Sequence, residues 1–420
     1  MECADLLLPN PTLNILRTVF GPAFLCLLLG CGPEMVSEHT TTVRDPAGIT
    51  IVENQESVLQ SGGGWSIAPD PRVVIGSIDG PEVDWLLRVQ GALCLGDGRI
   101  AVANDGSQEL RIYGTDGSHL RSVGGNGEGP GQFKSVMLIG LFADTLVVLD
   151  PVLRRVSLIH PDGGFVRSFT PVESATSLPM GGWLFQTGMV LIRNLALGDL
   201  SPLEGKPGRM PEPYKVFDMS GALLMDFGVF PGPEQVMATI QTEQGPAPVR
   251  SPVPFGKTPQ IAVAGGRVYF GAQDAFEIKV FGDNGSLQKI VRLDRPAVPV
   301  TDADLAAFIH ELGIEDEALV RRRIEGLPRV AYKPYHGSVF ADSEGYLFVE
   351  DFRSPGMEAS AMNVFDPEGR LVGRFEVPAG VEVQEIGEDH LLALFRDEMG
   401  VEHLQIFELA RPKPGSAGRP

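Results

Sequence analysis

The stretch from Gly91 to Val123 reads GALCLGDGRIAVANDGSQELRIYGTDGSHLRSV, and much of the chain repeats its pattern. Short runs of apolar and β-branched residues alternate with turn sequences such as Gly96-Asp-Gly98 and Asp116-Gly117. Turns of this composition favour tight hairpins because their residues tolerate positive φ. The stretch therefore predicts a meander of four antiparallel strands, at residues 91–95, 99–104, 109–113 and 119–123.

The same order of runs recurs, so that six units align on their second and third strands. The other second-strand runs are residues 146–150, 189–194, 267–272, 346–351 and 390–395. The other third-strand runs are residues 155–160, 214–218, 277–281, 362–366 and 403–409. Several second strands are apolar at consecutive residues, as in Leu146-Val-Val-Leu149. Such runs are typical of a sheet that is covered on both faces.

The last unit lacks a fourth strand, because residues 411–420 follow its third strand and read as a disordered tail. A spare strand-like run, Gly48-Ile-Thr-Ile-Val-Glu53, lies at the opposite end. If this run completes the last unit, the units form a ring without exposed edges. We therefore predict an all-β fold, a six-bladed β-propeller at residues 46–410 closed by an N-terminal strand. A large β-sandwich or two smaller barrels would not explain the matching counts of six.

Irregular segments gather in the third to fifth units. Residues 195–213 and 230–258 are rich in Pro and Gly and predict long loops. Residues 301–326 predict a short helical insertion between blades four and five, because Thr301 and Asp304 are spaced as a capping box before apolar residues of helical period. We expect these insertions to build up one face of the ring, where loops of this length commonly serve function.

The first thirty residues read as a secretory signal, since a short apolar run from Thr18 ends in Leu28-Leu-Gly-Cys31. This ending resembles the lipobox of bacterial lipoproteins, although a signal anchor or a chance apolar run is the alternative. The resemblance implies a signal peptide at residues 1–30, a lipid anchor on Cys31 and a flexible tether at residues 31–45. The mature chain would then be held at a membrane without spanning it, on the extracytoplasmic side. By resemblance to lipoprotein sorting, Gly32 rather than Asp after the lipidated cysteine implies delivery to the outer membrane if the host has two membranes.

Four stretches carry a second resemblance. Residues 123–133, VGGNGEGPGQF, are similar to the loop between successive blades of NHL-repeat propellers, and residues 98–113 are similar to a blade core of that family. Residues 335–350 and 365–369 strengthen the similarity. Together with the lipobox, the chain resembles secreted bacterial six-bladed propeller lipoproteins. This resemblance is specific for the fold and weak for function.

Charge excludes one class of partner. Lys and Arg number 34 and Asp and Glu number 54, which gives a formal net charge of −20 over 420 residues. A protein this acidic repels a phosphate backbone unless it carries a basic face, and the sequence shows no such face. We therefore expect no nucleic-acid partner.

Polar residues recur where second strands end, near the predicted axial mouth. Carboxylates there could bind Ca²⁺, as in gluconolactonase-like propellers, or could hold turns by accepting backbone hydrogen bonds. Arginines on the same side could bind an anionic ligand or balance those carboxylates, and one histidine precedes a first strand. The candidate ligand-binding residues are Arg88, Asp105, Asp150, Asn194, Asp274, His336, Asp351, Arg353 and Arg396.

Catalytic signatures do not stand out in the sequence. Histidines are scattered over the blade map, so we predict no metal site built from them. Cys94 lies between Leu93 and Leu95 and is interpreted as a core residue. We expect a non-enzymatic scaffold that binds a protein segment or a small ligand, with no cofactor. The alternatives are a propeller hydrolase or lyase of the lactonase type that uses Ca²⁺ or Zn²⁺, and a purely structural role in the cell envelope.

Overall fold

The computed structural model describes residues 41–56, 64–171, 177–196, 203, 205–242, 245–326, 328–357, 359–378 and 380–412. All of them belong to one compact unit, residues 39–420. The predicted signal peptide, Cys31, residues 31–40 of the predicted tether and residues 413–420 of the predicted tail lie outside the described residues.

The described strands form six sheets, and their hydrogen-bonded neighbours are antiparallel except for one pair. The first three sheets are β5 (Val89–Cys94), β6 (Ile100–Asn104), β7 (Glu109–Tyr113) and β8 (His119–Gly124); β9 (Met137–Phe142), β10 (Thr145–Asp150), β11 (Arg155–His160) and β12 (Gly164–Phe169); and β13 (Ser177–Leu184), β14 (Val190–Ala196), β15 (Gly208–Phe217), β16 (Leu223–Thr242) and β17 (Gly245–Pro252).

The other three sheets also contain the strands nearest the N-terminus. They are β18 (Gln260–Ala264), β19 (Arg267–Gly271), β20 (Glu277–Gly282) and β21 (Leu287–Asp294) with β1 (Thr42–Arg44) and β2 (Thr50–Gln55); β22 (Val339–Ala341), β23 (Leu347–Glu350), β24 (Ser360–Phe365) and β25 (Leu371–Val377); and β26 (Val381–Ile386), β27 (His390–Arg396) and β28 (Glu402–Ala410) with β3 (Ser66–Ile67) and β4 (Val73–Ile75).

Each sheet packs against two others, as the runs of consecutive apolar residues predict. On β10, Leu146 and Val148 face the β5–β8 sheet, whereas Val147 and Leu149 face the β13–β17 sheet. Successive side chains of a strand point to opposite faces, so a strand buried on both faces must be apolar throughout. Six clusters of buried residues join neighbouring sheets in this way.

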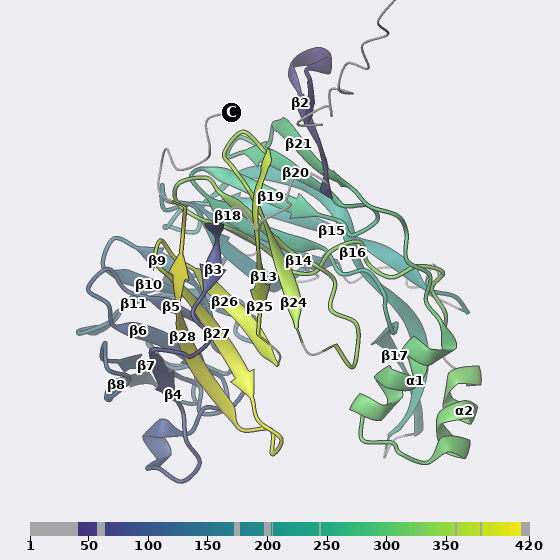
Figure 1. Cartoon of the computed structure of the whole chain (residues 1–420). Helices are drawn as coiled ribbons and strands as arrows, with labels where there is room; N and C mark the ends of the chain where they lie inside the picture. The colour runs from purple at the N-terminus through teal and green to yellow at the C-terminus, as the bar shows by residue number, and fades with distance from the viewer. Residues whose placement is uncertain are drawn as a thin grey trace, which may run out of the picture. The chain divides into compact units, whose positions relative to one another are not determined.

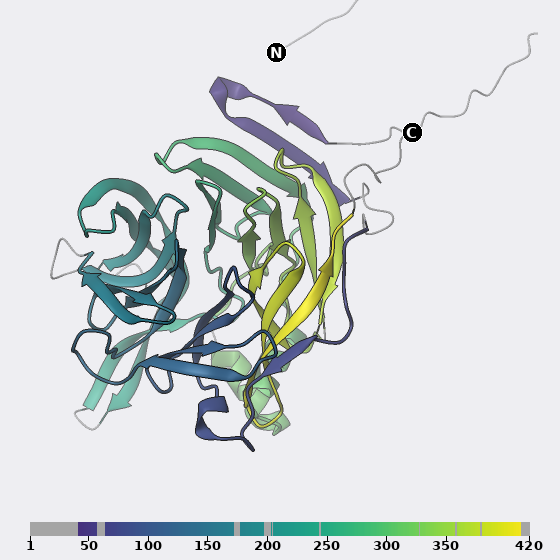
Figure 2. The same cartoon turned by 90° about the vertical axis from the view of Figure 1, so that its left-hand side faces the viewer.

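The order of these contacts returns to its starting point. The first strands contact one another in the order β5, β9, β13, β18, β22 and β26, and β26 contacts β5. Leu392 and Leu394 of β27 pack with Ile100 and Val102 of β6, so the last sheet shares a core with the first. Figure 2 shows the sheets arranged about a common centre. The fold is a β-propeller, mostly β with few helices.

The strand that completes the last sheet is not the predicted one. Thr50–Gln55 form β2, which pairs in parallel with β21, so the predicted closure by residues 48–53 is wrong. β3 and β4 instead pair antiparallel with β28, with Ile67 opposite Leu409 and Ile75 opposite Leu404. The run that forms β2 and the run that forms β4 are both short and mostly apolar. Their local sequences therefore do not show which of them pairs with β28.

Asn54 gives the physical reason why β2 lies beside β21. Its Nδ2 donates hydrogen bonds of 3.0 Å to the carbonyl oxygens of Arg292 and Gly369. Its Oδ1 accepts a 2.9 Å bond from the Leu371 N–H. Because Asn54 and Val52 are buried, moving this strand would leave several polar groups without partners.

The ends of the predicted propeller also need correction. Thr42–Arg44, predicted as tether, form β1, which pairs antiparallel with β2. Arg411, predicted to lie in a disordered tail, is ordered. Its guanidinium lies 5.2 Å from the centre of the Trp65 ring and 2.7 Å from Asp342 Oδ2. The stacking and the ion pair hold this residue against the β22–β25 sheet.

The helical insertion is confirmed as α1 (Asp302–Glu311) and α2 (Glu317–Gly326). Thr301 Oγ1 accepts a bond from the Asp304 N–H, and the Asp304 carboxylate accepts one from the Thr301 N–H, so the predicted capping box is present. Leu305 and Ile309 are buried. Among the described residues, no helix has the length and apolar character that a membrane span needs.

In the stretches predicted as long loops, residues 195–213 and 230–258, most of the described residues are strand. β15 begins at Gly208 and β16 extends to Thr242, so that β16 and β17 form a long hairpin. The prolines of β17 are tolerated because β17 is an edge strand. Figures 1 and 2 both show this hairpin and the two helices projecting from the same side of the sheets. The insertions therefore gather on one side, as expected.

Ile75 and Val74 provide a matched test of the closing strand. Ile75 is 2% exposed and packs in the cluster that joins the last and first sheets, whereas Val74 beside it is 52% exposed. We expect Ile75→Ala to lower the free energy of unfolding by about 2 to 4 kcal/mol, because it leaves a cavity in that cluster. Val74→Ala should change it by about 0.5 kcal/mol or less. Urea unfolding monitored by circular dichroism measures both, and equal effects would contradict this packing.

Candidate functional site

The first strands surround the centre of the ring, and a recess opens at each of their ends. We call one the loop-side recess, because turns between second and third strands and links between sheets border it. The other is the hairpin-side recess, bordered by turns between first and second strands. The two recesses measure about 320 Å³ and about 510 Å³, respectively.

Polar side chains from three adjacent sheets line the loop-side recess. They include Gln260 of β18, Ser338 at the start of β22, Glu350 of β23 and Glu382 of β26. Arg353, a predicted site residue, also lines it. The recess therefore offers hydrogen-bond donors and acceptors as well as charges of both signs.

Arg353 links two sheets at this recess. Its Nη1 donates a 3.0 Å hydrogen bond to the Val381 carbonyl, and its Nη2 lies 3.0 Å from Glu350 Oε1 and from Ser360 Oγ. Its buried Nε has no hydrogen-bond partner in the part of the chain that the structure describes. The guanidinium is thus held in one orientation, and Glu350 balances its charge.

Two predicted carboxylates hold the links between sheets. Asp105 Oδ1 accepts a 2.9 Å hydrogen bond from the Val136 N–H. Asp150, which is fully buried, accepts bonds of 2.8 Å from the Lys134 N–H and 2.9 Å from the Leu153 N–H. These bonds fit the alternative in which the carboxylates stabilise turns rather than bind a cation.

The other two predicted carboxylates bind basic side chains. Asp351 lies 2.6 Å from Arg374 and 2.7 Å from Asn363 Nδ2, and it also pairs with Arg295. Asp274 lies 2.9 Å from Arg209 and 3.4 Å from a lysine, Lys257. The four predicted carboxylates therefore have separate partners and do not converge on one point.

Arg88, Arg396 and Asn194 also have partners within the protein. Arg88 lies 3.3 Å from Asp105, and Asn194 Nδ2 donates to the Ile192 carbonyl. Arg396 lies 3.0 Å from Glu402 and 3.3 Å from Glu382, which lines the loop-side recess. Of the nine predicted residues, the structure places Arg353 at this recess and Arg396 beside it.

His336, predicted to face the mouth, is fully buried, so that placement is wrong. Its ring packs against Phe276, and Nδ1 lies 2.9 Å from the Gly337 carbonyl, which makes Nδ1 the protonated nitrogen. None of the described residues forms a hydrogen bond with Nε2, and a Cβ at Gly271 would lie 2.7 Å from it. Burial lowers the pKa of His336 to about 4, because a charged ring would lose its hydration there.

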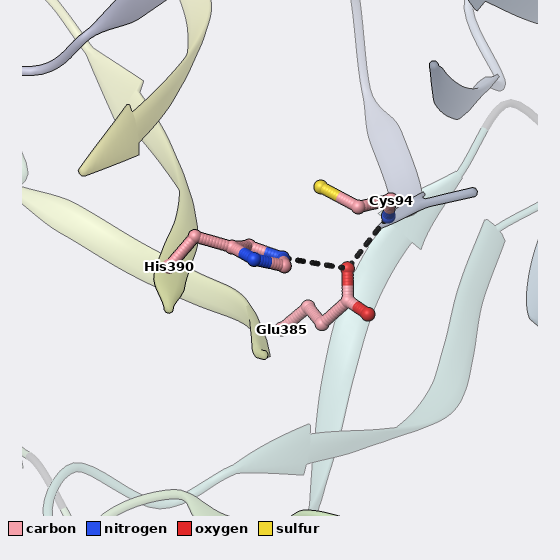
Figure 3. Close-up of side chains that lie close together, drawn as sticks. All are labelled: Cys94, Glu385 and His390. Carbon is pink, nitrogen blue, oxygen red and sulfur yellow. Dashed lines mark hydrogen bonds and ion pairs between the residues drawn. The ribbon is translucent and has the colours of Figure 1, made fainter. Parts of the chain in front are cut away.

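The hairpin-side recess is lined by the first strands β13, β18, β22 and β26. Glu385 of β26 lies on its wall. Cys94, Glu385 and His390 come together here, with ligand atoms that all lie within 4.8 Å of one another. Figure 3 shows the three side chains directed toward one another from β5, β26 and β27.

Hydrogen bonds and an ion pair connect Cys94, Glu385 and His390 with one another and with Asp389. Glu385 Oε2 accepts a 2.6 Å bond from the Cys94 N–H and lies 3.8 Å from His390 Nε2. His390 Nδ1 lies 3.0 Å from Asp389 Oδ1. The neighbouring Cys94 and Glu385 side chains raise the pKa of His390 to about 10, although burial acts in the opposite direction.

Sequence reasoning missed this trio. Cys94 lies about 290 residues from Glu385, so no motif of fixed spacing contains both. They meet because β26 contacts β5 where the ring returns to its first sheet. The signal that could have revealed the trio has two parts. The first is the correct strand pairing that closes the ring, and the second is the set of polar residues near the turns after β5 and β26.

No protein-family model and no curated protein matches the sequence. Among solved structures, a member of the DUF4221 family from Bacteroides vulgatus is 9% identical, with 84% of this chain and 100% of that chain covered and a TM-score of 0.50. A Bacteroides fragilis protein thought to be exported is 11% identical, with coverages of 87% and 100% and a TM-score of 0.49. The calcium-binding protein regucalcin from Agrobacterium tumefaciens is 13% identical, with coverages of 83% and 96% and a TM-score of 0.40. Likeness at this identity concerns the fold alone.

His336 predicts a pH dependence of stability. Its pKa in the folded protein is about 4, below the ordinary value of 6.5, so the unfolded chain binds a proton first as the pH falls. Between pH 7 and pH 4.5 we expect the wild type to lose about 2 to 3 kcal/mol more unfolding free energy than His336→Gln. The difference should vanish above pH 7. Urea unfolding of both proteins across this range tests it, and parallel pH profiles would contradict the buried neutral ring.

Proposed function

We propose that this chain is an exported, membrane-tethered, six-bladed β-propeller that binds a small polar ligand in its loop-side recess without catalysing a reaction. The observation that carries this proposal is the lining of the recess. Groups of both charges and uncharged hydrogen-bonding groups meet there from three sheets, and Arg353 is held in place by Val381, Glu350 and Ser360.

The size and setting of the recess support a small ligand. Its volume of about 320 Å³ is at the lower end of the range for small-molecule sites. The β16–β17 hairpin and the two helices project on the same side of the sheets. Phe255, which follows the hairpin, contacts Phe308 of α1 with ring centres 6.4 Å apart. These insertions would shield the recess from one direction.

Six blades in a closed ring account for the packing. Six clusters of buried residues each join two neighbouring sheets, and one of them joins the last sheet to the first. The export and tethering part of the proposal rests on the lipobox-like sequence ending at Cys31. Multiple acyl chains give stable anchoring, whereas a single chain is marginal.

A lactonase-like reaction has weaker support. It requires oxygen ligands directed together at the axis to hold a cation. In the described part of the chain, Asp105 and Asp150 instead accept backbone hydrogen bonds, and Asp274 and Asp351 bind basic side chains. These partners favour binding without chemistry at the loop-side recess.

Ser338→Trp tests the recess directly, because the indole would fill it. We expect a panel of amino acids, sugars and small dicarboxylates to contain compounds that raise the melting temperature of the wild type. Binding to the folded state adds RT ln(1 + [L]/Kd) to its stability, about 2.7 kcal/mol at one hundred times Kd. Ser338→Trp should lose this response in differential scanning fluorimetry.

Leu120→Trp is the control for added bulk, since Leu120 is exposed on the outer strand β8. This variant should keep the wild-type ligand response. A panel without any stabilising compound, or a Ser338→Trp protein that responds like the wild type, would count against the proposal.

Cys31 tests the tether. Because the lipid is attached through the Cys31 sulfur in lipobox-type processing, Cys31→Ala should move the protein from the membrane pellet to the soluble fraction. Mass spectrometry of the wild-type N-terminal peptide should show acylation on residue 31. Wild-type protein that sediments with membranes without acylation, or a variant that still sediments, would refute this anchor.

A further inference from the structure

Three different metal-binding side chains converge where the ring returns to its first sheet. Cys94 ends β5 of the first sheet, and Glu385 and His390 belong to β26 and β27 of the last. Their sulfur, oxygen and nitrogen atoms lie within 4.8 Å of one another. Metal–ligand bonds about 2.0 to 2.3 Å long keep any two ligands of one ion within about 4.6 Å, so a small rotation of these side chains suffices to bring them around one ion.

The His390 ring is already oriented as a metal ligand would be. Nδ1 is bonded to Asp389 Oδ1 at 3.0 Å, and the buried Nε2 lies 3.8 Å from Glu385 Oε2 and has no hydrogen-bond partner among the described residues. Metal-binding histidines usually donate their second N–H to a carboxylate, a backbone carbonyl or water, which fixes the ring and the tautomer. A buried nitrogen without a partner is costly unless something binds it.

The backbone around His390 makes room for this orientation. A Cβ at Gly387 would lie 2.1 Å from His390 Cε1, so only glycine allows the ring to fold back over its own turn. The Gly387 N–H donates a 2.9 Å bond to the His390 carbonyl, which fixes that turn. The pairing of β26 with β27 shifts register between Val383 and Glu385, which places a bulge next to the ligand position on β26.

We propose that Cys94 Sγ, His390 Nε2 and the Glu385 carboxylate bind a divalent metal ion of the zinc class. A set of one sulfur, one nitrogen and one oxygen ligand suits Zn²⁺, whereas Ca²⁺ and Mg²⁺ take oxygen ligands. Three protein ligands leave one tetrahedral position for water or a ligand. Glu385 also lines the hairpin-side recess, so this position adjoins about 510 Å³ of accessible space.

The metal would link the first and last sheets where the ring closes. Its ligands come from β5 on one side and from β26 and β27 on the other, so binding requires the first and last sheets to be in contact. An ion that binds only the closed ring stabilises it. The site is separate from the loop-side recess, which opens at the other ends of the first strands.

Metal content of the purified full-length protein tests the proposal. After incubation with excess ZnCl₂ and gel filtration, the wild type should retain about one zinc ion per chain, as one closed set of ligands predicts. Cys94→Ser and His390→Gln should each lose that ion. His119→Gln is the matched control, since His119 lies on β8 of the same sheet as Cys94 and bonds Ser122 instead. Replacement by Co²⁺ should give a thiolate-to-cobalt absorption band in the wild type and not in Cys94→Ser.

Asp389→Asn keeps the test valid if a ligand variant fails to fold. It retains all three ligands and weakens the support of His390, so zinc affinity should fall about 10- to 100-fold while circular dichroism stays unchanged. Zinc should raise the melting temperature of the wild type and of His119→Gln, and it should slow alkylation of Cys94 by iodoacetamide. The proposal would be overturned if the wild type retained no zinc or if Cys94→Ser had the zinc content of the wild type. Rapid alkylation of Cys94 that zinc does not slow would also overturn it.

Discussion

Two-sided packing of the sheets is the constraint on which the rest of the structure depends. Val147 and Leu149 need one neighbouring sheet, and Leu146 and Val148 on the same strand need another. A row of such sheets would leave an apolar face exposed at each end, and only a return of the last sheet to the first removes both. The closing strand β4 and the cluster around it therefore matter more to stability than any single loop.

The contact between the last and first sheets also positions the proposed metal ligands. Glu402 of β28 is buried and accepts a 2.8 Å hydrogen bond from the Val89 N–H at the start of β5, and it pairs with Arg396. At the other end of β5, the Cys94 N–H donates to Glu385. Polar contacts thus align the two sheets at both ends of their shared apolar cluster. The same alignment brings the proposed metal ligands of β5, β26 and β27 together.

Local patterns in the sequence were enough for the strands and the helices, because turn residues, apolar runs and the Thr301–Asp304 capping box act over a few positions. Which strand pairs with β28 could not be predicted in this way, because residues 49–52 and 73–75 are both short and mostly apolar. The hydrogen bonds of Asn54, which hold β2 beside β21, are visible only in the structure. The prolines near residue 248 indicated a loop, yet an edge strand accepts them. His336 seemed exposed because the sequence gives its position along the strand and not the ring of Phe276 that covers it.

Amide hydrogen exchange in two truncated proteins tests ring closure by β3 and β4 most directly. One protein would lack residues 1–56 and therefore β1 and β2, and the other would lack residues 1–76 and therefore also β3 and β4. If β4 closes the ring, the amides of Leu404 and Ile406 on β28, which face β4 and not β27, stay protected in the first protein and exchange rapidly in the second. Loss of protection in the first protein, or full protection in the second, would contradict the account.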